Sequence, residues 1–177
     1  MKLSEGVEAA IHSVTILAAL QPGETMPAAA FADTYEISAS YLLKHLKALV
    51  ADGLLESVPG PQGGYRLARA AEKITLLDIV LAIEGPRPAF RCTEIRQRGP
   101  VRLPAEVYAK PCGISAAMLK AERAYRAALA ETSIADIAAD FSAEADPRAV
   151  GAACAFAQQN KRPQGRSKIP PAEGEKA

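Results

Sequence analysis

The chain has 177 residues, 49% of them hydrophobic, which is enough to bury the core of one domain or of a small domain with an arm. Its 21 Lys and Arg residues nearly balance its 20 Asp and Glu residues, so the net charge of +1 excludes binding of nucleic acid through bulk charge, and any DNA-binding charge must be local. The 3 cysteines, an odd number, argue against a secreted disulfide scaffold, and the lack of a signal-peptide pattern or of an apolar run near the roughly 18 residues of a membrane span predicts a cytoplasmic protein without membrane contact.

The N-terminal part predicts two helices. The first runs from Leu3 to Leu20 with Ser4 as its N-cap, because apolar residues recur at the helical period of about 3.6 residues, at Val7, Ile11, Val14, Leu17 and Ala18. Residues 21–23 end this helix. Pro27 begins a short second helix, since proline is favoured at the first helical position, and residues 36–38 form the turn that follows.

The most informative stretch runs from Ser38 to Leu67 and combines a helix with a glycine-rich hairpin. The helix begins at Ser38 or Ser40, ends before the C′ glycine Gly53, and turns inward its apolar residues Leu42, Leu46, Leu49 and Val50. Residues 54–58 and 65–68 read as strands, and residues 59–64 as the loop between them. This is the pattern of a winged helix, which places one helix in the major groove of DNA and the hairpin beside it.

Two sets of exposed residues are predicted to contact DNA. The polar side of the third helix would read bases, and the hairpin tip would lie along phosphates, where glycine permits close approach of the backbone. The predicted contacts are Ser38, Ser40, Tyr41, Lys44, His45, Lys47, Gly60, Gln62, Gly63, Gly64 and Arg66. On the pattern alone, an ordinary helix and hairpin with a solvated basic face stays an equal alternative.

The remaining segments alternate between clear helices and stretches without periodicity. Thr75 caps a helix that ends at Gly85, and residues 115–132 form a long helix able to pair with its copy in a dimer. Residues 133–141 form a shorter helix, capped by Ser133 or Thr132. We divide the chain into residues 1–85, a winged helix-turn-helix DNA-binding domain; residues 86–112, an aperiodic loop with two cysteines; residues 113–145, dimerisation helices; and residues 146–177, a weak helix near 149–156 and a disordered tail from 160 onward. The expected fold class is mainly α with a small β-hairpin.

Four residues carry possible metal chemistry. Glu8 and His12 lie one helical turn apart on the same face of the first helix, and two thiolates, Cys92 and Cys112, lie in the loop. The residues alone also allow a surface Glu–His pair with unrelated thiols, a disulfide switch or a Zn²⁺ site. Cys154 is expected to be a buried or free thiol. We predict no enzyme, because the chain has 2 histidines and lacks a nucleophile elbow, a phosphate loop and paired catalytic carboxylates.

From Met1 to about Asp136 the chain resembles the IscR/NsrR family of winged-helix transcription regulators. The resemblance lies in MKLSEGVEAAIH, SASYLLKHLKALVADGLLESVPGPQGGYRLAR and EKITLLDIVLAIEGP, in this order. It implies a homodimer that binds a palindromic operator in double-stranded DNA, with the long helix after the cysteine loop forming the dimer contact. Many members of the family hold an iron–sulfur cluster beside that helix.

Cluster-binding members commonly carry three closely spaced cysteines, whereas this loop has Cys92 and then Cys112. Together with Glu8 and His12, the segment CTEIRQRGPVRLPAEVYAKPC is similar to the RsrR redox-sensor subgroup, which binds a 2Fe–2S cluster through Glu, His and two Cys. The resemblance implies that Glu8 and His12 come from one subunit and the cysteines from the other, which makes residues 86–112 the cluster-ligand loop. We expect a repressor whose operator affinity follows the redox state of this cluster; the alternative is a winged-helix regulator that has no cofactor or uses zinc or a thiol switch.

Overall fold

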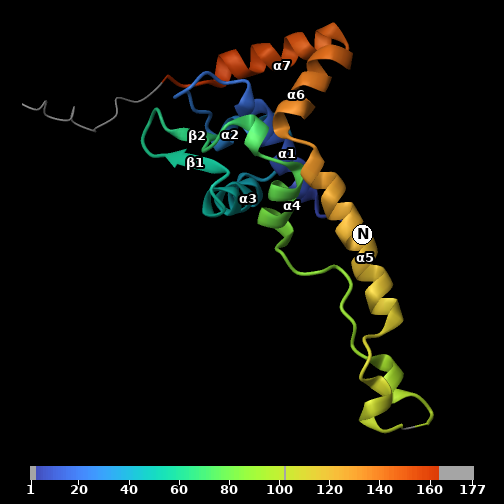
Figure 1. The fold of residues 1–177 in the computed structure, drawn as a ribbon. Helices are drawn as coiled ribbons and strands as arrows, with labels where there is room; N and C mark the ends of the chain where they lie inside the picture. Colours follow the sequence, from blue (N-terminus) through green and yellow to red (C-terminus); the bar gives the residue numbers. More distant parts are fainter. Residues whose placement is uncertain (1–2, 102, 164–177) are drawn as a thin grey trace, which may run out of the picture.

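The computed structural model describes residues 3–101 and 103–163. The chain is mainly helical with one two-stranded antiparallel hairpin, which confirms the predicted fold class (Figure 1). The helices are α1 (Glu5–Ala18), α2 (Ala28–Thr34), α3 (Ala39–Ala51), α4 (Leu76–Glu84), α5 (Gly113–Glu131), α6 (Ile134–Glu144) and α7 (Pro147–Asn160). The strands are β1 (Leu55–Val58) and β2 (Gly64–Leu67), and short 3-10 helices are η1 (Ala71–Lys73), η2 (Ile95–Arg98) and η3 (Ala105–Tyr108).

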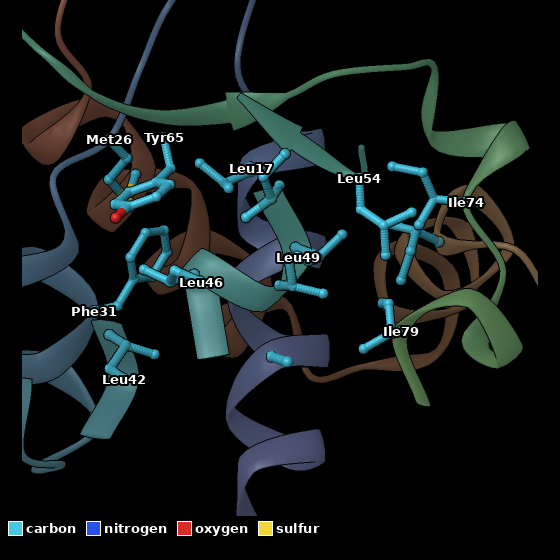
Figure 2. Packing of buried hydrophobic residues seen from close by; sticks show 14 of the residues in the cluster. Leu17, Met26, Phe31, Leu42, Leu46, Leu49, Leu54, Tyr65, Ile74 and Ile79 are labelled. Carbon is cyan, nitrogen blue, oxygen red and sulfur yellow. The ribbon is translucent and has the colours of Figure 1, made fainter. Parts of the chain in front are cut away.

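One core fills the space between α1, α2, α3, the hairpin, α4 and α6. The predicted inner face of α3 is confirmed, since Leu42, Leu46 and Leu49 are fully buried, and Phe31 of α2 and Leu54 before β1 pack in the same cluster (Figure 2). Burial of one such side chain stabilises the fold by about 1.5–3 kcal/mol. This core fixes α3 against the body, so that its opposite side is left for a partner.

The hairpin is held to the segment before α2 as well as to itself. Within the hairpin, Leu55 pairs with Leu67 and Val58 with Gly64. Met26 donates its N–H to the Tyr65 carbonyl at 2.9 Å, and Tyr65 donates back to the Met26 carbonyl at 2.8 Å. A Cβ atom on Gly64 would lie 2.5 Å from the Met26 carbonyl oxygen, so this position needs glycine for a close approach within the protein itself.

The starts of α4 and α6 lie side by side and are capped alike. Thr75 and Ser133 each form a capping box with the Asp three residues later, which confirms both predicted helix starts. The backbone of Leu76 donates to the Thr132 carbonyl at 3.0 Å, and that of Ile134 donates to the Ile74 carbonyl at 2.8 Å. The C-terminal end of α5 is therefore joined to the body.

Beyond this junction α5 projects from the body as an arm. None of its apolar residues is buried, and the loop before it extends along it toward its N-terminal end (Figure 1). The loop contains η2 and η3, so it has local structure that the aperiodic sequence did not predict. Within residues 3–101 and 103–163, no helix combines the length and apolarity needed to cross a bilayer.

Helix α7 is longer than the predicted weak helix over residues 149–156. It begins at Pro147, and the side chain of its N-cap Asp146 accepts a hydrogen bond from the Arg148 backbone at 2.8 Å. Asn160 belongs to this helix and Arg162 pairs with Thr25, so the disorder predicted from residue 160 is wrong for these residues. The rest of that prediction, on residues 164–177, lies outside the described residues.

Candidate nucleic-acid interface and metal-ligand residues

Most of the predicted DNA-contacting residues of α3 lie on its solvent side. Ser38, Ser40, Lys44 and Lys47 are exposed, opposite the buried leucines of the same helix. The hydroxyl groups of Ser38 and Ser40 lie 2.9 Å apart and hydrogen-bond to each other, without capping the helix. This side of α3 presents two cations and two hydroxyl groups, which suits contact with phosphates and base edges.

His45 departs from the expectation, because it is buried with only 6% of its surface exposed. The prediction that it lies on the exposed side of α3 is wrong: position 45 falls within the stripe set by Leu42, Leu46 and Leu49. Its ring lies edge-on to Tyr41 with a centroid distance of 4.5 Å. Burial, and then the charge of Lys44, lower the pKa of His45, so the neutral imidazole is favoured.

The His45 ring packs against Gly6 of α1. A Cβ atom at Gly6 would lie 2.4 Å from the imidazole Cε1, so a larger residue there would require the ring to move. The imidazole Nε2 atom is buried without a hydrogen-bond partner within the described part of the chain. This contact links α1, which carries Glu8 and His12, directly to the predicted recognition helix α3.

The hairpin tip is divided between exposed and buried positions. Gly60 and Gln62 are exposed, whereas Gly63 is buried. Arg66 forms a two-point ion pair with Glu56 on the opposite strand, with both hydrogen bonds at 2.9 Å. A phosphate that contacts Arg66 must therefore compete with the Glu56 carboxylate.

Glu8 and His12 are both exposed on α1, as a ligand pair requires. The His12 ring lies 5.5 Å from the Tyr35 ring, centroid to centroid. Next to His12, a mainly apolar pocket of about 280 Å³ lies between α1, α6 and α7 and includes Cys154, which is exposed rather than buried. The rings of His12 and Tyr35 thus form one wall of this pocket.

Cys92 and Cys112 lie together at the other end of the arm, where Cys112 is the N-cap of α5. The backbone N–H groups of Ser115 and then Ile114 lower the pKa of the Cys112 thiol, although they complete no cap hydrogen bond, and Cys92 lowers it further. The thiolate is the form that binds metals. The Cys92 thiol donates to the Glu94 carboxylate at 3.7 Å.

Arg96 organises the loop around these two cysteines and was not singled out from the sequence. Its guanidinium pairs with Glu94 at 2.6 Å, donates to the Lys110 carbonyl at 2.7 Å and lies 5.4 Å from the Tyr108 ring centre. Glu94 has a left-handed backbone with φ of 50°. These contacts depend on how the loop folds back on itself, and the sequence offers no local signal for them.

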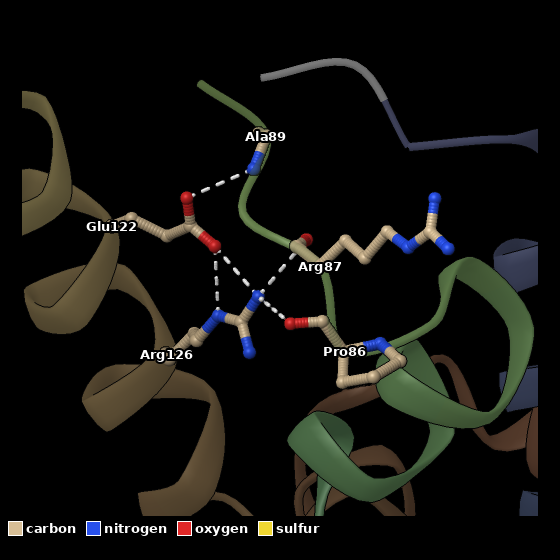
Figure 3. Close-up of polar contacts among 5 residues, drawn as sticks. All are labelled: Pro86, Arg87, Ala89, Glu122 and Arg126. Atoms are coloured by element: carbon tan, nitrogen blue, oxygen red, sulfur yellow. Dashed lines mark hydrogen bonds and ion pairs between the residues drawn. The ribbon is translucent and has the colours of Figure 1, made fainter. Parts of the chain in front are cut away.

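A second set of contacts fixes the start of the loop to α5 (Figure 3). Arg126 donates to the Pro86 carbonyl at 3.0 Å and to the Arg87 carbonyl at 3.3 Å, and it pairs with Glu122 at 2.6 Å. Glu122 also accepts a hydrogen bond from the Ala89 backbone at 2.9 Å. The direction in which the cysteine loop leaves the body is set by this pair.

The structure does not bring the four predicted ligands together in one protomer. Among the residues that it describes, no group of three or more His, Cys, Asp or Glu side chains lies close enough to hold a metal ion. Figure 1 shows α1 in the helical body and the cysteine loop at the far end of α5. The donor types nevertheless fit an iron–sulfur cluster: two neighbouring thiols, of which Cys112 has a lowered pKa, and an exposed imidazole and carboxylate.

Comparisons with known proteins agree with this architecture. A family described as Rrf2, iron-dependent transcriptional regulator, matches residues 3–140. A Lactococcus lactis protein named as the HTH-type transcriptional regulator YffB is 36% identical over 138 residues, which cover 78% of this chain and 87% of YffB. The HTH-type transcriptional regulator NsrR of Bacillus subtilis is 28% identical over 77% of this chain and 90% of its own. The solved structure of T. potens IscR has a TM-score of 0.61 at 22% identity, with 82% of this chain and 93% of that chain covered.

Proposed function

Because the chain belongs to the Rrf2 family of iron-dependent transcriptional regulators, and thus is a DNA-binding regulator of transcription, we propose that it is a homodimeric repressor controlled by the redox state of a 2Fe–2S cluster. The observation that supports control by a shared cluster is the division of the four proposed ligands into two pairs. Glu8 and His12 are exposed on the helical body, and Cys92 and Cys112 are close together at the far end of an arm. Two copies can complete each other's sites, as the similarity to the RsrR subgroup implies.

The arm offers the surface for such a dimer. Ile114 and Met118 of α5 expose 68% and 45% of their surfaces in the single chain. A second copy of the same helix would cover these apolar residues, which favours association through α5. The dimer would present two copies of α3 to palindromic half-sites about 34–36 Å apart, or a multiple of that distance.

In this proposal the cluster, its ligands and the helices that carry them have separate roles. When bound, the cluster supplies one-electron redox chemistry at the dimer interface. Glu8 and His12 would hold the cluster from α1 of one subunit, and Cys92 and Cys112 would hold it from the loop of the other. A displacement of α1 reaches α3 directly, because Gly6 packs against His45. The proposal thus places the ligands on the helix that can reposition the DNA-binding surface.

The test is the absorption spectrum of the full chain, purified anaerobically from iron-replete cells, with iron and sulfide counts. We expect visible charge-transfer bands, and we expect Cys92→Ala to remove them while the dimer stays intact. Cys154→Ala is the matched control, since Cys154 lies outside the proposed ligand set and is exposed on α7. A colourless, iron-free wild-type protein would contradict the cluster but leave DNA binding in place.

One observation favours a second candidate, a thiol switch without a cofactor. Cys92 and Cys112 lie close enough for the first to lower the pKa of the second, so the same pair could form a disulfide. The two thiols would then pass two electrons and two protons to an oxidant such as diamide. An iron-free protein that loses these two thiols on oxidation, and changes its DNA affinity at the same time, would favour this candidate over the cluster.

A further inference from the structure

The segment that follows α7 returns toward the hairpin and pairs with the strip of chain beside it. The Arg162 backbone N–H donates to the Thr25 carbonyl at 2.8 Å, and Thr25 donates back to the Arg162 carbonyl at 3.1 Å. The next residue, Met26, pairs in the same way with Tyr65 of β2. Lys161 adds an ion pair with Glu24 at 2.8 Å. The C-terminal segment is therefore bonded to the strip of chain that supports the wing.

The side chain of Arg162 contacts the wing turn, which is the loop of residues 59–63 between the two strands. One of its nitrogen atoms, Nη1, donates to the Pro61 carbonyl at 2.7 Å and to the Gly63 carbonyl at 2.9 Å. The Thr25 hydroxyl donates to the carbonyl between them, that of Gln62, at 3.3 Å. Three successive carbonyl groups of the turn are thus held from outside the hairpin.

This turn needs external support to keep one shape. Its own backbone contributes a hydrogen bond from Gly63 to the Gly60 carbonyl at 2.9 Å, and Gly60 has a φ of 103° that glycine adopts without strain. Glycine-rich turns lose much conformational entropy when they are ordered. If the turn became ordered only on binding, the cost of this lost entropy would make the free energy of DNA binding less favourable.

We propose that the segment after α7 is part of the DNA-binding module and that Arg162 is a positioning residue, which holds the wing turn in the shape that presents Gln62 to DNA. The inference rests on the proposed DNA-binding role of the wing. It concerns residues outside the region 3–140 that matches the family. The Pro61 and Gly63 carbonyls are neutral acceptors, so Arg162 holds the turn through hydrogen bonds and not through an ion pair with it.

The test compares full-length variants by fluorescence anisotropy on a mixed-sequence DNA duplex, because wing contacts to phosphate do not depend on base sequence. Arg162→Met removes the donors but keeps the aliphatic stem, and we expect it to weaken binding roughly tenfold, which corresponds to about 1.4 kcal/mol. Arg148→Met is the matched control: Arg148 lies at the other end of α7, its side chain is 91% exposed, and it pairs with the neighbouring Asp146. We expect this control to bind within about twofold of wild type.

Three further readouts separate positioning from other roles. We call the hydrogen bonds from Arg162 to the Pro61 and Gly63 carbonyls the brace. The effect of losing the brace on DNA affinity should be non-additive with the effect of Gln62→Ala. Its loss should leave both the melting temperature and the salt dependence of binding unchanged. If Arg162 instead contacts phosphate, Arg162→Lys would restore binding and Arg162→Met would reduce the salt slope by roughly one ion, which would overturn the positioning role. Wild-type affinity in Arg162→Met would overturn it as well.

Hydrogen exchange in the DNA-free protein keeps the test independent of the proposed function. We expect the Gly63 amide to exchange faster in Arg162→Met than in wild type, with no change in Arg148→Met, because the brace stabilises the turn before any DNA is bound. Unchanged Gly63 exchange would overturn the inference. A wild-type chain that binds no duplex, with faster Gly63 exchange in the variant, would refute the DNA-binding role and leave the brace.

Discussion

His45 shows how one buried side chain can couple the stability of this fold to pH. Its imidazole is enclosed by Gly6 of α1 and by Tyr41, and its Nε2 atom has no hydrogen-bond partner within the described residues. Of the charged groups near it, Lys44 opposes protonation and Glu84 favours it, and burial outweighs both. The pKa of His45 is therefore lower in the folded chain than in the unfolded chain, where a histidine titrates near about 6.5.

We predict that the free energy of unfolding falls as the pH is lowered from about 7.5 to about 5.5, because the unfolded chain then binds a proton that folded His45 resists. The contribution is fully present above the unfolded pKa and is lost below it. Urea unfolding across this range should show the loss in wild type and in His12→Gln, since His12 is exposed. His45→Leu should remove most of this dependence, and a pH-dependent loss that persists in this variant would contradict the assignment.

At the scale of elements, the sequence predicts those whose signals are local. The Leu42, Leu46 and Leu49 stripe located α3, and Thr75 located the start of α4 through its capping box. The glycines of the hairpin tip indicated the wing. His45 was misassigned because a polar residue within an apolar stripe was read by its chemistry, whereas its place on the helix decides its burial.

Elements held by distant partners could not be predicted in this way. Arg96 and Arg126 order the cysteine loop through backbone carbonyls that become neighbours only when the chain folds. Arg162 reaches the wing across most of the sequence. Of the proposed ligands, the helical spacing of Glu8 and His12 placed them on one face, but which protomer supplies the cysteines depends on assembly.

The ion pair between Glu122 and Arg126 offers a test of how the arm is attached. Glu122 is only 9% exposed in its side chain and Arg126 is 28% exposed, so removing one partner leaves a poorly solvated charge. We predict that Arg126→Met lowers the free energy of unfolding by about 1–3 kcal/mol, which urea denaturation can measure. Arg123→Met is the control because Arg123 is exposed on the same helix, and it should change stability by less than about 0.5 kcal/mol.

Limited proteolysis tests the same ion pair locally, by the cleavage rate of the loop that it holds. Cleavage within residues 86–112 should be faster in Arg126→Met than in Arg123→Met, because only the first loses the bonds to the Pro86 and Arg87 carbonyls. Equal cleavage and equal stability of the two variants would mean that the pair contributes no more than a surface ion pair.

At the scale of the whole molecule, the proposed sensor is incomplete in one protomer. The arm carries Cys92 and Cys112 away from the body that carries Glu8 and His12, and exposes the apolar residues Ile114, Met118 and Val107. If each protomer bound its own cluster, a fold that separates the cysteines from Glu8 and His12 would prevent the proposed site from forming. The same geometry suits a dimer in which each arm reaches the partner's α1.

Sharing of the ligands between two subunits predicts a metal content that a site within one protomer cannot produce. A heterodimer is formed from one subunit with Glu8→Ala and His12→Ala and another with Cys92→Ala and Cys112→Ala, each with its own affinity tag. The first subunit keeps its cysteines and the second keeps its Glu8 and His12, so one of the two shared sites is intact. We predict about half the iron and sulfide per dimer of the wild type, and almost none in either homodimer.

The homodimers and the heterodimer separate the possible sites by their metal content. If all four ligands came from one protomer, the heterodimer would have no intact site and would be free of iron. If the thiolates alone held the metal, the Glu8→Ala, His12→Ala homodimer would keep its full content. Only ligation across the interface leaves both homodimers empty and the heterodimer half-filled. That result would also require that two subunits associate, so it tests the dimer and the site in one measurement.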